Sequence, residues 1–394
     1  MERRFVPGNA RLLKELNQYQ ILDALRRHGS LARSELARIT GLTPPTVGAI
    51  TAALLADGLL LEGEGLPAAS AGRRAVPLSL NAEWGVAIGV LLSITRAQVL
   101  AVDLGGAVRG RAEFAVRSGA QPGEVADGIA AAVQRVVAEV RPRRVIGAGA
   151  ALHGLVDHAG GVMRFAPHFG WRDVPFAAML AERLELPVVA DNDVRCMALG
   201  ELWFGAGRGV QNFVCVRVGT GIGAGIVLDG SLFRGGRALA GEIGHFTVDL
   251  NGPLCHCGSR GCLETVASGP AIARRAGMES ATAVARAAEA GDARALQALA
   301  DAGTHVGVAI ANLAKTLDPE LVLIGGGVAR AGEHLLAPLR RAIAAHALDQ
   351  RAVVPVHPVA LGDDAAAVGA AALVLERFFR GGAVPAVLGW MGRH

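Results

Sequence analysis

The stretch that decides the fold is Gly241-Glu242-Ile243-Gly244-His245 together with Cys255-His256-Cys257-Gly258-Ser259-Arg260-Gly261-Cys262-Leu263-Glu264. Its three cysteines follow a C-x-C-x4-C pattern, and a histidine stands ten residues before the first of them. Three thiolates and one imidazole form the ligand set of a closed tetrahedral zinc site. We therefore expect one structural Zn²⁺ per chain, bound by His245, Cys255, Cys257 and Cys262.

Two alternatives to this ligand set stay open. His256 could replace His245, although a residue between two ligating cysteines points outward more easily. The three thiols could also form a reduced cluster without metal. The remaining cysteines, Cys196 and Cys215, fall in a predicted helix and a predicted strand, where we expect buried, unreactive thiols.

Composition indicates a multidomain protein with a large apolar core. The 394 residues suggest two or three domains. The mean hydropathy of +0.38 comes from alanine and aliphatic residues, without an apolar run long enough for a membrane span. Five cysteines are too few for a disulfide scaffold, and the N-terminal residues contain no apolar segment of a signal peptide. We expect a cytoplasmic, globular protein.

The net charge of +4 is concentrated near the N-terminus. The first 80 residues contain ten basic and seven acidic side chains, a net charge of +3, whereas the other 314 contain 29 and 28. A basic head on a nearly neutral body is typical of DNA-binding regulators.

The head has the pattern of a helix-turn-helix. Leucine and isoleucine recur at helical spacing over residues 9–28, and Gly29 ends that segment. Ser34 is expected to cap a short second helix, with Leu36 and Ile39 facing inward, that ends at Gly41. Thr43 then caps a third helix beginning Pro44-Pro45-Thr46, with Val47, Ile50 and Leu54 as its buried stripe.

Two short apolar runs after this helix, 59–61 and 76–80, enclose a basic loop and predict a wing. We expect the N-terminus of the third helix to enter the major groove of DNA with Thr43, Pro45 and Thr46, and Thr51 as a further candidate. Arg73 and Arg74 would reach phosphates or the minor groove. The alternative is a three-helix protein-interaction module with a solvated arginine loop.

The body alternates apolar strands with alanine-rich helices, which predicts an α/β fold. Residues 85–92, 96–106 and 107–116 read as three consecutive antiparallel strands, followed by a helix over 122–140 and a strand over 144–151. Glycine clusters at 219–225 and 325–327 suit either the close approach of a phosphate or polar ligand, or tight turns.

The combination of GEIGH with CxCGxxGCxE resembles the signature of the ROK family (repressors, open reading frames and kinases). The similarity extends to Ala190-Asp191-Asn192-Asp193, the Pro167–Trp171 segment, GTGIGAG at 219–225 and the helix around Gly369–Leu375. It implies a two-lobed, actin-like (ribonuclease H-like) sugar kinase fold with a sugar in the interlobe cleft. An added N-terminal winged helix is what the repressor branch carries.

The resemblance also implies residue roles. In sugar kinases of the family, the aspartate matching Asp193 is the general base, and the positions matching Asn192, Glu242, His245 and Glu264 hold sugar hydroxyls. His245 would then use one ring nitrogen for zinc and the other for the sugar. Gly154 and His168 are further pocket candidates, and His168 stands where relatives often have asparagine. The sugar could be xylose, glucose or an N-acetylated sugar, with neutral aldoses slightly favoured.

Repressor and kinase differ at the first phosphate motif. Kinases of the family have Asp-x-Gly-Gly-Thr there, which positions Mg²⁺–ATP, whereas the corresponding stretch here is Ala87-Ile88-Gly89-Val90-Leu91. Asp103-Leu104-Gly105-Gly106-Ala107 lies one hairpin later and reads as a structural turn. Asp193 would then be a sugar ligand without catalysis.

The sequence therefore predicts a non-enzymatic, sugar-responsive transcriptional repressor of carbohydrate genes. It would bind an inverted-repeat operator as a homodimer, or as a tetramer, and the sugar would alter DNA affinity by shifting lobe closure. The alternatives are an ATP-dependent sugar kinase and a regulator controlled by a protein partner. The expected domains are the winged helix at 1–82, a first lobe at 83–190 completed by helix 363–380, and a second lobe at 191–362.

Overall fold

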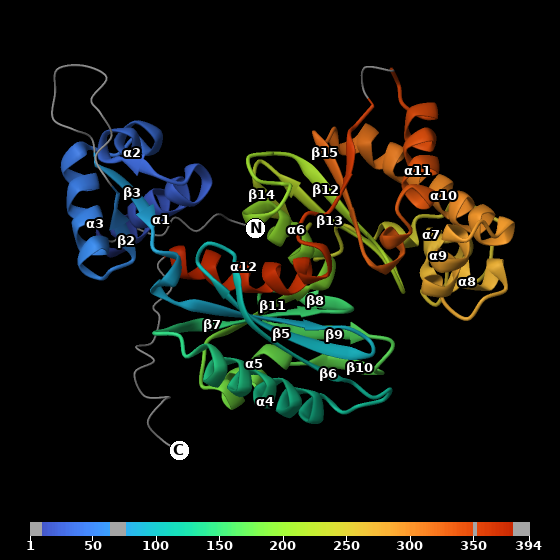
Figure 1. The fold of residues 1–394 in the computed structure, drawn as a ribbon, viewed down its shortest axis with the longest axis horizontal. Coiled ribbons are helices and arrows are strands. Elements are labelled where there is room, and N and C mark those ends of the chain that lie inside the picture. The colour runs from blue at the N-terminus through green and yellow to red at the C-terminus, as the bar shows by residue number, and fades with distance from the viewer. Residues whose placement is uncertain (1–9, 64–75, 350–352, 381–394) are drawn as a thin grey trace. The chain divides into compact units, whose positions relative to one another are not determined.

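The computed structural model describes residues 10–63, 76–349 and 353–380, and divides into two compact units. The first unit comprises residues 1–152, 159–190 and 370–394, and the second comprises 153–158 and 191–369. Figure 1 labels the elements of both units, which are described separately below.

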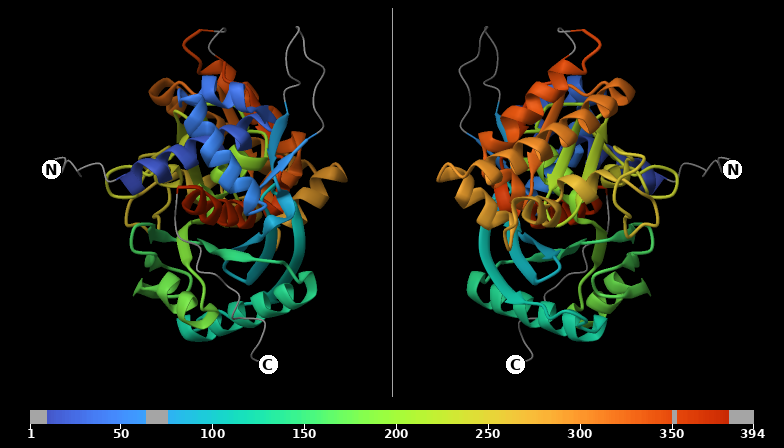
Figure 2. Two further views of the ribbon diagram at one scale, coloured as in Figure 1. Left: turned by 90° about the vertical axis from the view of Figure 1, so that its left-hand side faces the viewer. Right: turned by 90° about the vertical axis from the view of Figure 1, so that its right-hand side faces the viewer.

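The N-terminal elements of the first unit form a winged helix (Figures 1 and 2). Helices α1 (Ala10–His28), α2 (Arg33–Thr40) and α3 (Pro44–Ala56) pack against a small sheet of β1 (Leu31–Ala32), β3 (Pro77–Leu80) and β2 (Leu60–Glu62). Strands β2 and β3 pair antiparallel, Leu60 opposite Leu80, which confirms the predicted wing hairpin. Arg73 and Arg74, predicted to lie in the loop between these strands, fall within residues 64–75, which are outside the described residues.

Local chemistry sets the helix boundaries. The Thr43 side chain accepts a hydrogen bond from the Thr46 N–H and so caps α3, as predicted, and Gly41 ends α2 in the left-handed conformation with φ 70°. The prediction of Ser34 as the cap of α2 is wrong. Because β1 pairs with β3, the chain enters the helix at Arg33, and the Glu35 carboxylate accepts from the Ala32 N–H instead.

Two predictions about which side chains of the head are buried or exposed also need correction. Ile39, expected to face inward, is exposed. Leu13 and Leu16 in the first half of α1 are exposed as well. Thr51, a candidate for contact with DNA, is fully buried, and its hydroxyl donates to the Val47 carbonyl within α3. It is therefore not available to a ligand of the helix surface.

The rest of the first unit is a five-stranded sheet in the order β11-β7-β4-β5-β6. Strands β4 (Val86–Leu92), β5 (Arg96–Asp103) and β6 (Val108–Ala115) form the predicted antiparallel meander, preceded by the 3-10 turn Ala82–Trp84. Strand β7 (Val145–Leu152) runs parallel to β4, and β11 (Val188–Asn192) follows at the edge. Helix α4 (Pro122–Val140) lies along one face, and residues 370–379 of α12 (Ala365–Phe379) lie along the other (Figure 1). The strands β9 (Val162–Ala166) and β10 (Trp171–Val174) precede α5 (Phe176–Leu184).

The turn predicted to be structural is structural. Asp103 is buried between β5 and β6, and its Oδ1 atom accepts hydrogen bonds from the N–H groups of Gly105 and Ala107. Its Oδ2 atom lies 2.6 Å from Arg109 Nε. These hydrogen bonds of the Asp103 carboxylate therefore all stabilise the hairpin between β5 and β6.

The second unit is built on a sheet in the order β14-β13-β12-β15-β16. Its strands are β12 (Phe213–Val218), β13 (Ile222–Leu228), β14 (Ser231–Phe233), β15 (Leu321–Gly325) and β16 (Val356–Pro358). The short strand β8 (Leu155–Asp157) also belongs to the second unit but is not part of this sheet. The helices are α6 (Asp193–Phe204), α7 (Leu263–Ala267), α8 (Gly269–Ala276), α9 (Ala281–Glu289), α10 (Ala293–Leu317) and α11 (Glu333–Ala345). Three 3-10 segments complete it, at Ile243–His245, Gly327–Ala331 and Gly362–Asp364.

Glycines allow the helices of this unit to pack closely. Helices α10 and α11 lie side by side (Figure 2), so close together that a Cβ at Gly307 would overlap the Leu339 carbonyl. Helix α6 crosses the start of α12 where a Cβ at Gly369 would overlap the Cys196 carbonyl. These contacts fix α6, whose N-terminus begins at Asp193.

None of the helices in the described part of the chain is by itself long and apolar enough to cross a membrane. Helices α2 and α3 meet that criterion only as a pair bent by 119°. They are the two helices of the helix-turn-helix.

Candidate functional site

The GEIGH segment lies flat on strand β13. A Cβ at Gly241, which has φ 94°, would overlap the Ala224 carbonyl, and a Cβ at Gly244 would overlap the Ile222 carbonyl. The Ala224 N–H donates to the Gly241 carbonyl at 2.7 Å. This close approach carries the chain into the 3-10 turn that ends at His245.

The cysteine segment folds back on itself through tight backbone turns. The Cys255 N–H donates to the Ser259 carbonyl at 2.7 Å, and Gly258 takes a φ of 93° that suits glycine. A bridge between Thr247 and Cys262 brings the end of this segment back beside the residues that follow His245. The histidine and the cysteines therefore meet.

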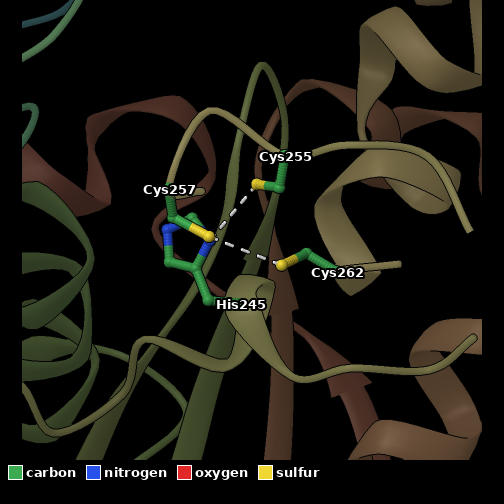
Figure 3. Close-up of side chains that lie close together, drawn as sticks. All are labelled: His245, Cys255, Cys257 and Cys262. Atoms are coloured by element: carbon green, nitrogen blue, oxygen red, sulfur yellow. Dashed lines mark hydrogen bonds between the residues drawn. The ribbon is translucent and has the colours of Figure 1, made fainter. Parts of the chain in front are cut away.

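Figure 3 shows the imidazole of His245 and the sulfurs of Cys255, Cys257 and Cys262 turned toward one another. Their ligand atoms all lie within 4.8 Å of one another. His245 Nδ1 lies 3.7 Å from Cys255 Sγ, and Cys257 Sγ lies 3.6 Å from Cys262 Sγ. Zinc–sulfur bonds of about 2.3 Å in a tetrahedron separate ligand atoms by roughly 3.8 Å. The four groups can thus hold one tetrahedral metal ion.

His256 lies beside this group. Its Nδ1 atom is 3.8 Å from Cys255 Sγ but also 3.5 Å from the Glu264 carboxylate, and its side chain is half exposed. The cluster that satisfies the mutual distances contains His245 and not His256.

The thiols have the chemistry of a cation site. Burial and the neighbouring thiols Cys257 and Cys255 raise the pKa of Cys262 to about 12. A hydrogen bond from the backbone of Ser259 instead lowers the pKa of the exposed Cys257 thiol. Three sulfurs gathered in one place become thiolates together only when a cation balances their charge, and a divalent metal is such a cation.

Asn192 and Asp193 lie where β11 ends and α6 begins. The Asn192 side-chain oxygen accepts hydrogen bonds from the N–H groups of Val194 and Arg195 and caps α6, while its amide donates to the Gly154 carbonyl at 3.0 Å. The capping role places the next side chain, Asp193, at the first position of the helix.

Asp193 is buried between two groups that sequence reasoning missed. Arg217 Nη1 and His153 Nδ1 each lie 3.3 Å from its Oδ2 atom. Burial would raise the pKa of Asp193, but Arg217, His153 and the Val194 N–H together lower it. A sequence signal for Arg217 existed, because it is the only charged residue in the apolar strand Phe213–Val218.

The two glutamates differ in their surroundings. The pKa of Glu242 is raised, mainly because its carboxyl group is buried. The charges of Asp193 and Glu264 raise this pKa further. The nearby positive charges of His245 and Arg195 act in the opposite direction. Glu264 Oε2 accepts a hydrogen bond from the Ile222 N–H at 2.9 Å, at the end of the Gly219–Gly221 turn. The carboxyl group of Glu242 thus interacts electrostatically with three other predicted sugar-binding residues, Asp193, His245 and Glu264.

A buried ion cluster supports this site from behind. Asp191, fully buried, lies 2.9 Å from Arg195 Nη1 and 2.7 Å from Arg234 Nε, and Arg195 also donates to the Ala238 carbonyl. The segment 234–238 is therefore tied to the start of α6, only a few residues before Glu242. Asp191 was noticed in the sequence as part of a motif, but its two arginine partners were not.

The predicted DNA contacts are on the surface of α3. Thr43 and Pro45 are exposed and Thr46 is partly so, all in the first turn of the helix. The hydroxyls of Thr43 and Thr46 lie 2.8 Å apart. Gly154 lies beside Asn192, whereas His168 belongs to the first unit.

The fold and these sites define a class of protein: a transcriptional regulator with a winged helix-turn-helix ahead of an α/β body of the sugar kinase type. Comparison with known families agrees, since a winged helix-turn-helix DNA-binding profile matches residues 15–60 and the ROK family profile matches residues 87–377. The chain belongs to the ROK family.

Its relatives include both regulators and enzymes. It is 28% identical over 374 residues to the xylose repressor of Bacillus subtilis, covering 93% of this chain and 96% of the relative. It is 41% identical over 254 residues to a glucokinase of Halalkalibacterium halodurans, covering 59% and 77%. A crystal structure of a ROK family transcriptional regulator, a homologue of the E. coli MLC protein, matches with a TM-score of 0.83 and 27% identity over 94% of this chain and 98% of that one.

Proposed function

We propose that this protein is a sugar-responsive transcriptional repressor that binds an inverted-repeat operator as a homodimer. The observation that carries the proposal is the exposed, Thr43-capped N-terminus of α3 in a winged helix that is continuous with a ROK body. Similarity to a xylose repressor over almost the whole chain supports it. A two-fold dimer matches the symmetry of an inverted repeat.

The proposed sugar contacts are Asn192, Asp193, Glu242, His245 and Glu264, which all belong to the second unit. One amide N–H of Asn192 donates to the Gly154 carbonyl, and the other has no partner among the described residues. The carboxylates offer acceptors for neighbouring hydroxyls. When bound, a zinc ion on the four predicted ligands would supply a structural cross-link, and coordination through Nδ1 would leave His245 Nε2–H as a fixed donor.

DNA release by a sugar is the direct test. An electrophoretic mobility shift with the protein's own upstream region, repeated across xylose, glucose and N-acetylglucosamine, should show a complex that one sugar weakens. Thr46→Glu should abolish the complex, because a carboxylate there faces DNA phosphates, whereas Thr304→Glu on α10 should leave it intact. Absence of any complex at low salt would overturn the proposal.

A sugar kinase is the second candidate, and the 41% identity to a glucokinase favours it. Two features oppose it. Ala87–Leu91 lies wholly inside β4, and the turn that follows, Ser93-Ile94-Thr95, keeps a threonine but contains no acidic residue and no glycine. Arg217 also pairs with the carboxylate that a kinase needs as its base. An ADP-release assay with several hexoses should give no turnover; sustained turnover would establish the kinase.

A further inference from the structure

The C-terminal end of α3 is held by residues that follow the wing in the chain. Trp84 Nε1 donates to the carbonyl of Asp57, the C-cap of α3, at 3.1 Å. The Arg144 guanidinium approaches both oxygens of the Asp57 carboxylate, at 3.2 and 3.3 Å. The Asn81 amide donates to the Gly58 carbonyl at 2.9 Å. Three donors therefore fix the end of α3 opposite to the one proposed to contact DNA.

The last turn of α12 contacts the same place. The indole of Trp84, which is almost completely buried, stacks on Phe378 with the ring centroids 5.2 Å apart. The Arg144 guanidinium lies 4.2 Å from the centroid of the Trp84 ring. Arg380, which follows α12, lies 5.2 Å from the ring centroid of Tyr19 in α1. The group that joins α3 to α12 is called the α3 joint below and consists of Asp57, Trp84, Arg144 and Phe378.

Helix α12 belongs to both units, because residues 365–369 are part of the second unit and the rest of the helix is part of the first. Its start packs on α6 within the second unit, where a Cβ at Gly200 would overlap the carbonyl of the first residue of α12. The fully buried Glu201 of α6 accepts hydrogen bonds from the N–H groups of residues 360 and 361, just before α12. Such close packing leaves no room for sliding, so α6 and the start of α12 move together.

A glycine contact in the first unit gives α12 a pivot. A Cβ at Gly149 in β7 would overlap the Ala370 carbonyl, so the helix backbone rests directly on the sheet there. From Ala370 to Phe378 the helix extends for about 12 Å, at 1.5 Å per residue. A tilt of about 5° around this point moves Phe378 by about 1 Å. A displacement of that size is enough to break a hydrogen bond such as the one from Trp84 to Asp57.

We propose that sugar binding reaches the DNA-binding end of α3 through α12 and the α3 joint, with Trp84 as the positioning residue. The inference rests on the proposed sugar-responsive repressor. A sugar on Asn192 and Asp193 contacts the N-terminus of α6, which moves together with the start of α12. Helix α3 has 13 residues, so about 20 Å separate the joint from Thr43, and a small rotation at the joint displaces that end relative to DNA. The sugar shifts this equilibrium by its differential affinity for the two positions of α12.

The test is the ratio of the Kd values for DNA with and without sugar. Fluorescence anisotropy of the labelled upstream region gives both values for the full-length protein, with xylose, glucose or N-acetylglucosamine as the probe. In the wild type, one of these sugars should raise the Kd for DNA roughly 5- to 150-fold. Trp84→Ala and Phe378→Ala should bring the ratio to within about twofold of one, because the joint no longer follows α12. Sugar affinity without DNA, measured by calorimetry, should stay unchanged.

Two substitutions on the surface of the first unit form a matched pair. Arg144→Gln removes the paired contact with Asp57 and should lower the ratio. Arg96→Gln should retain the full ratio. Arg96 pairs with Glu113 at 2.9 Å, and the partners of both ion pairs are exposed to almost the same extent, 39% and 49% here against 43% and 49% at the joint. The two variants therefore differ in whether the arginine contacts α3.

The outcomes separate this inference from the proposed function. A full ratio in Trp84→Ala or Phe378→Ala overturns the route through α12 and leaves the repressor standing. Loss of sugar affinity together with the ratio, or an equal loss in Arg96→Gln, also overturns it. If Trp84→Ala does not fold, Trp84→Phe, which keeps a ring but lacks the indole N–H, decides together with Phe378→Ala. A wild type whose DNA affinity no sugar changes overturns the proposed sugar response itself, and this route with it.

Discussion

Replacing Asp191 by asparagine is the change that most directly tests the buried support of the site. Asp191 accepts on both sides: its Oδ1 atom from Arg195 and the Asn192 N–H, and its Oδ2 atom from Arg234. An amide in either orientation points an N–H group at one of these donors. Asp191 and Arg195 are both almost completely buried, so the arginine loses its counter-charge where water cannot replace it.

The expected cost follows from this burial. Removing one partner of a buried ion pair destabilises a protein by about 3–5 kcal/mol. For a domain of about 200 residues, that corresponds to a decrease in Tm of roughly 6–20 °C. Sugar affinity should fall as well, because Arg234 and the Ala238 carbonyl lose the contacts that hold the segment leading to Glu242.

Asp301→Asn is the matched control. Asp301 also accepts on both sides, from Arg275 at 2.6 Å and from Gln297 at 2.8 Å, but at a surface where about a third of its side chain is exposed. Water can satisfy the donors there, so the loss should stay below about 1 kcal/mol. Urea unfolding of both variants measures the difference. Equal destabilisation by the two substitutions would show that burial does not set the cost, and the reasoning would be refuted.

Three further predictions concern the metal, the pH dependence and the head. Dialysed protein should retain about one zinc per chain. The Cys257→Ser substitution should lower this zinc content, whereas Cys215→Ser, at a buried cysteine outside the cluster, should not. Full zinc occupancy in Cys257→Ser would exclude Cys257 as a ligand. Because the folded-state pKa of Glu242 is raised, its burial favours folding below its unfolded pKa and costs stability as the pH rises through the folded value. Glu242→Gln should therefore stabilise the protein at pH 8 more than at pH 4.5 in thermal unfolding, and a pH-independent effect would contradict the shift. Thr43→Ala should lower the free energy of unfolding by about 1 kcal/mol, because α3 loses its N-cap. Denaturant unfolding measures this loss, and an unchanged stability would show that another group caps the helix.

Patterns that depend on local chemistry were predictable from the sequence. The capping threonine of α3, the meander of β4 to β6 and the Asp103 turn follow from residue types at fixed spacing, and the structure has all three. The spacing of the cysteines also brings the predicted metal ligands together. In each case the deciding residues lie within a few positions of one another, or in one folded-back segment.

Features that depend on distant partners were missed. Ser34 has a good capping side chain, but pairing of β1 with β3 starts α2 before it. Asp193 meets His153 from 40 residues upstream and Arg217 from 24 residues downstream, across separate elements. The sequence marks Arg217 as unusual in an apolar strand, but only the fold shows that the strand ends beside the carboxylate of Asp193.

The proposed zinc site, formed by His245, Cys255, Cys257 and Cys262, shares its chain segments with the proposed sugar site. Cys262 is the N-cap of α7 and stands two residues before Glu264, which accepts the Ile222 N–H, while His245 ends the segment that carries Glu242. A metal that joins His245 to Cys262 therefore fixes the distance between the segments bearing the two glutamates. Removing it should weaken sugar binding even where the rest of the unit stays folded, because the hydroxyl acceptors lose their common anchor. A chelator titration followed by both circular dichroism and sugar affinity would distinguish this coupling from simple unfolding.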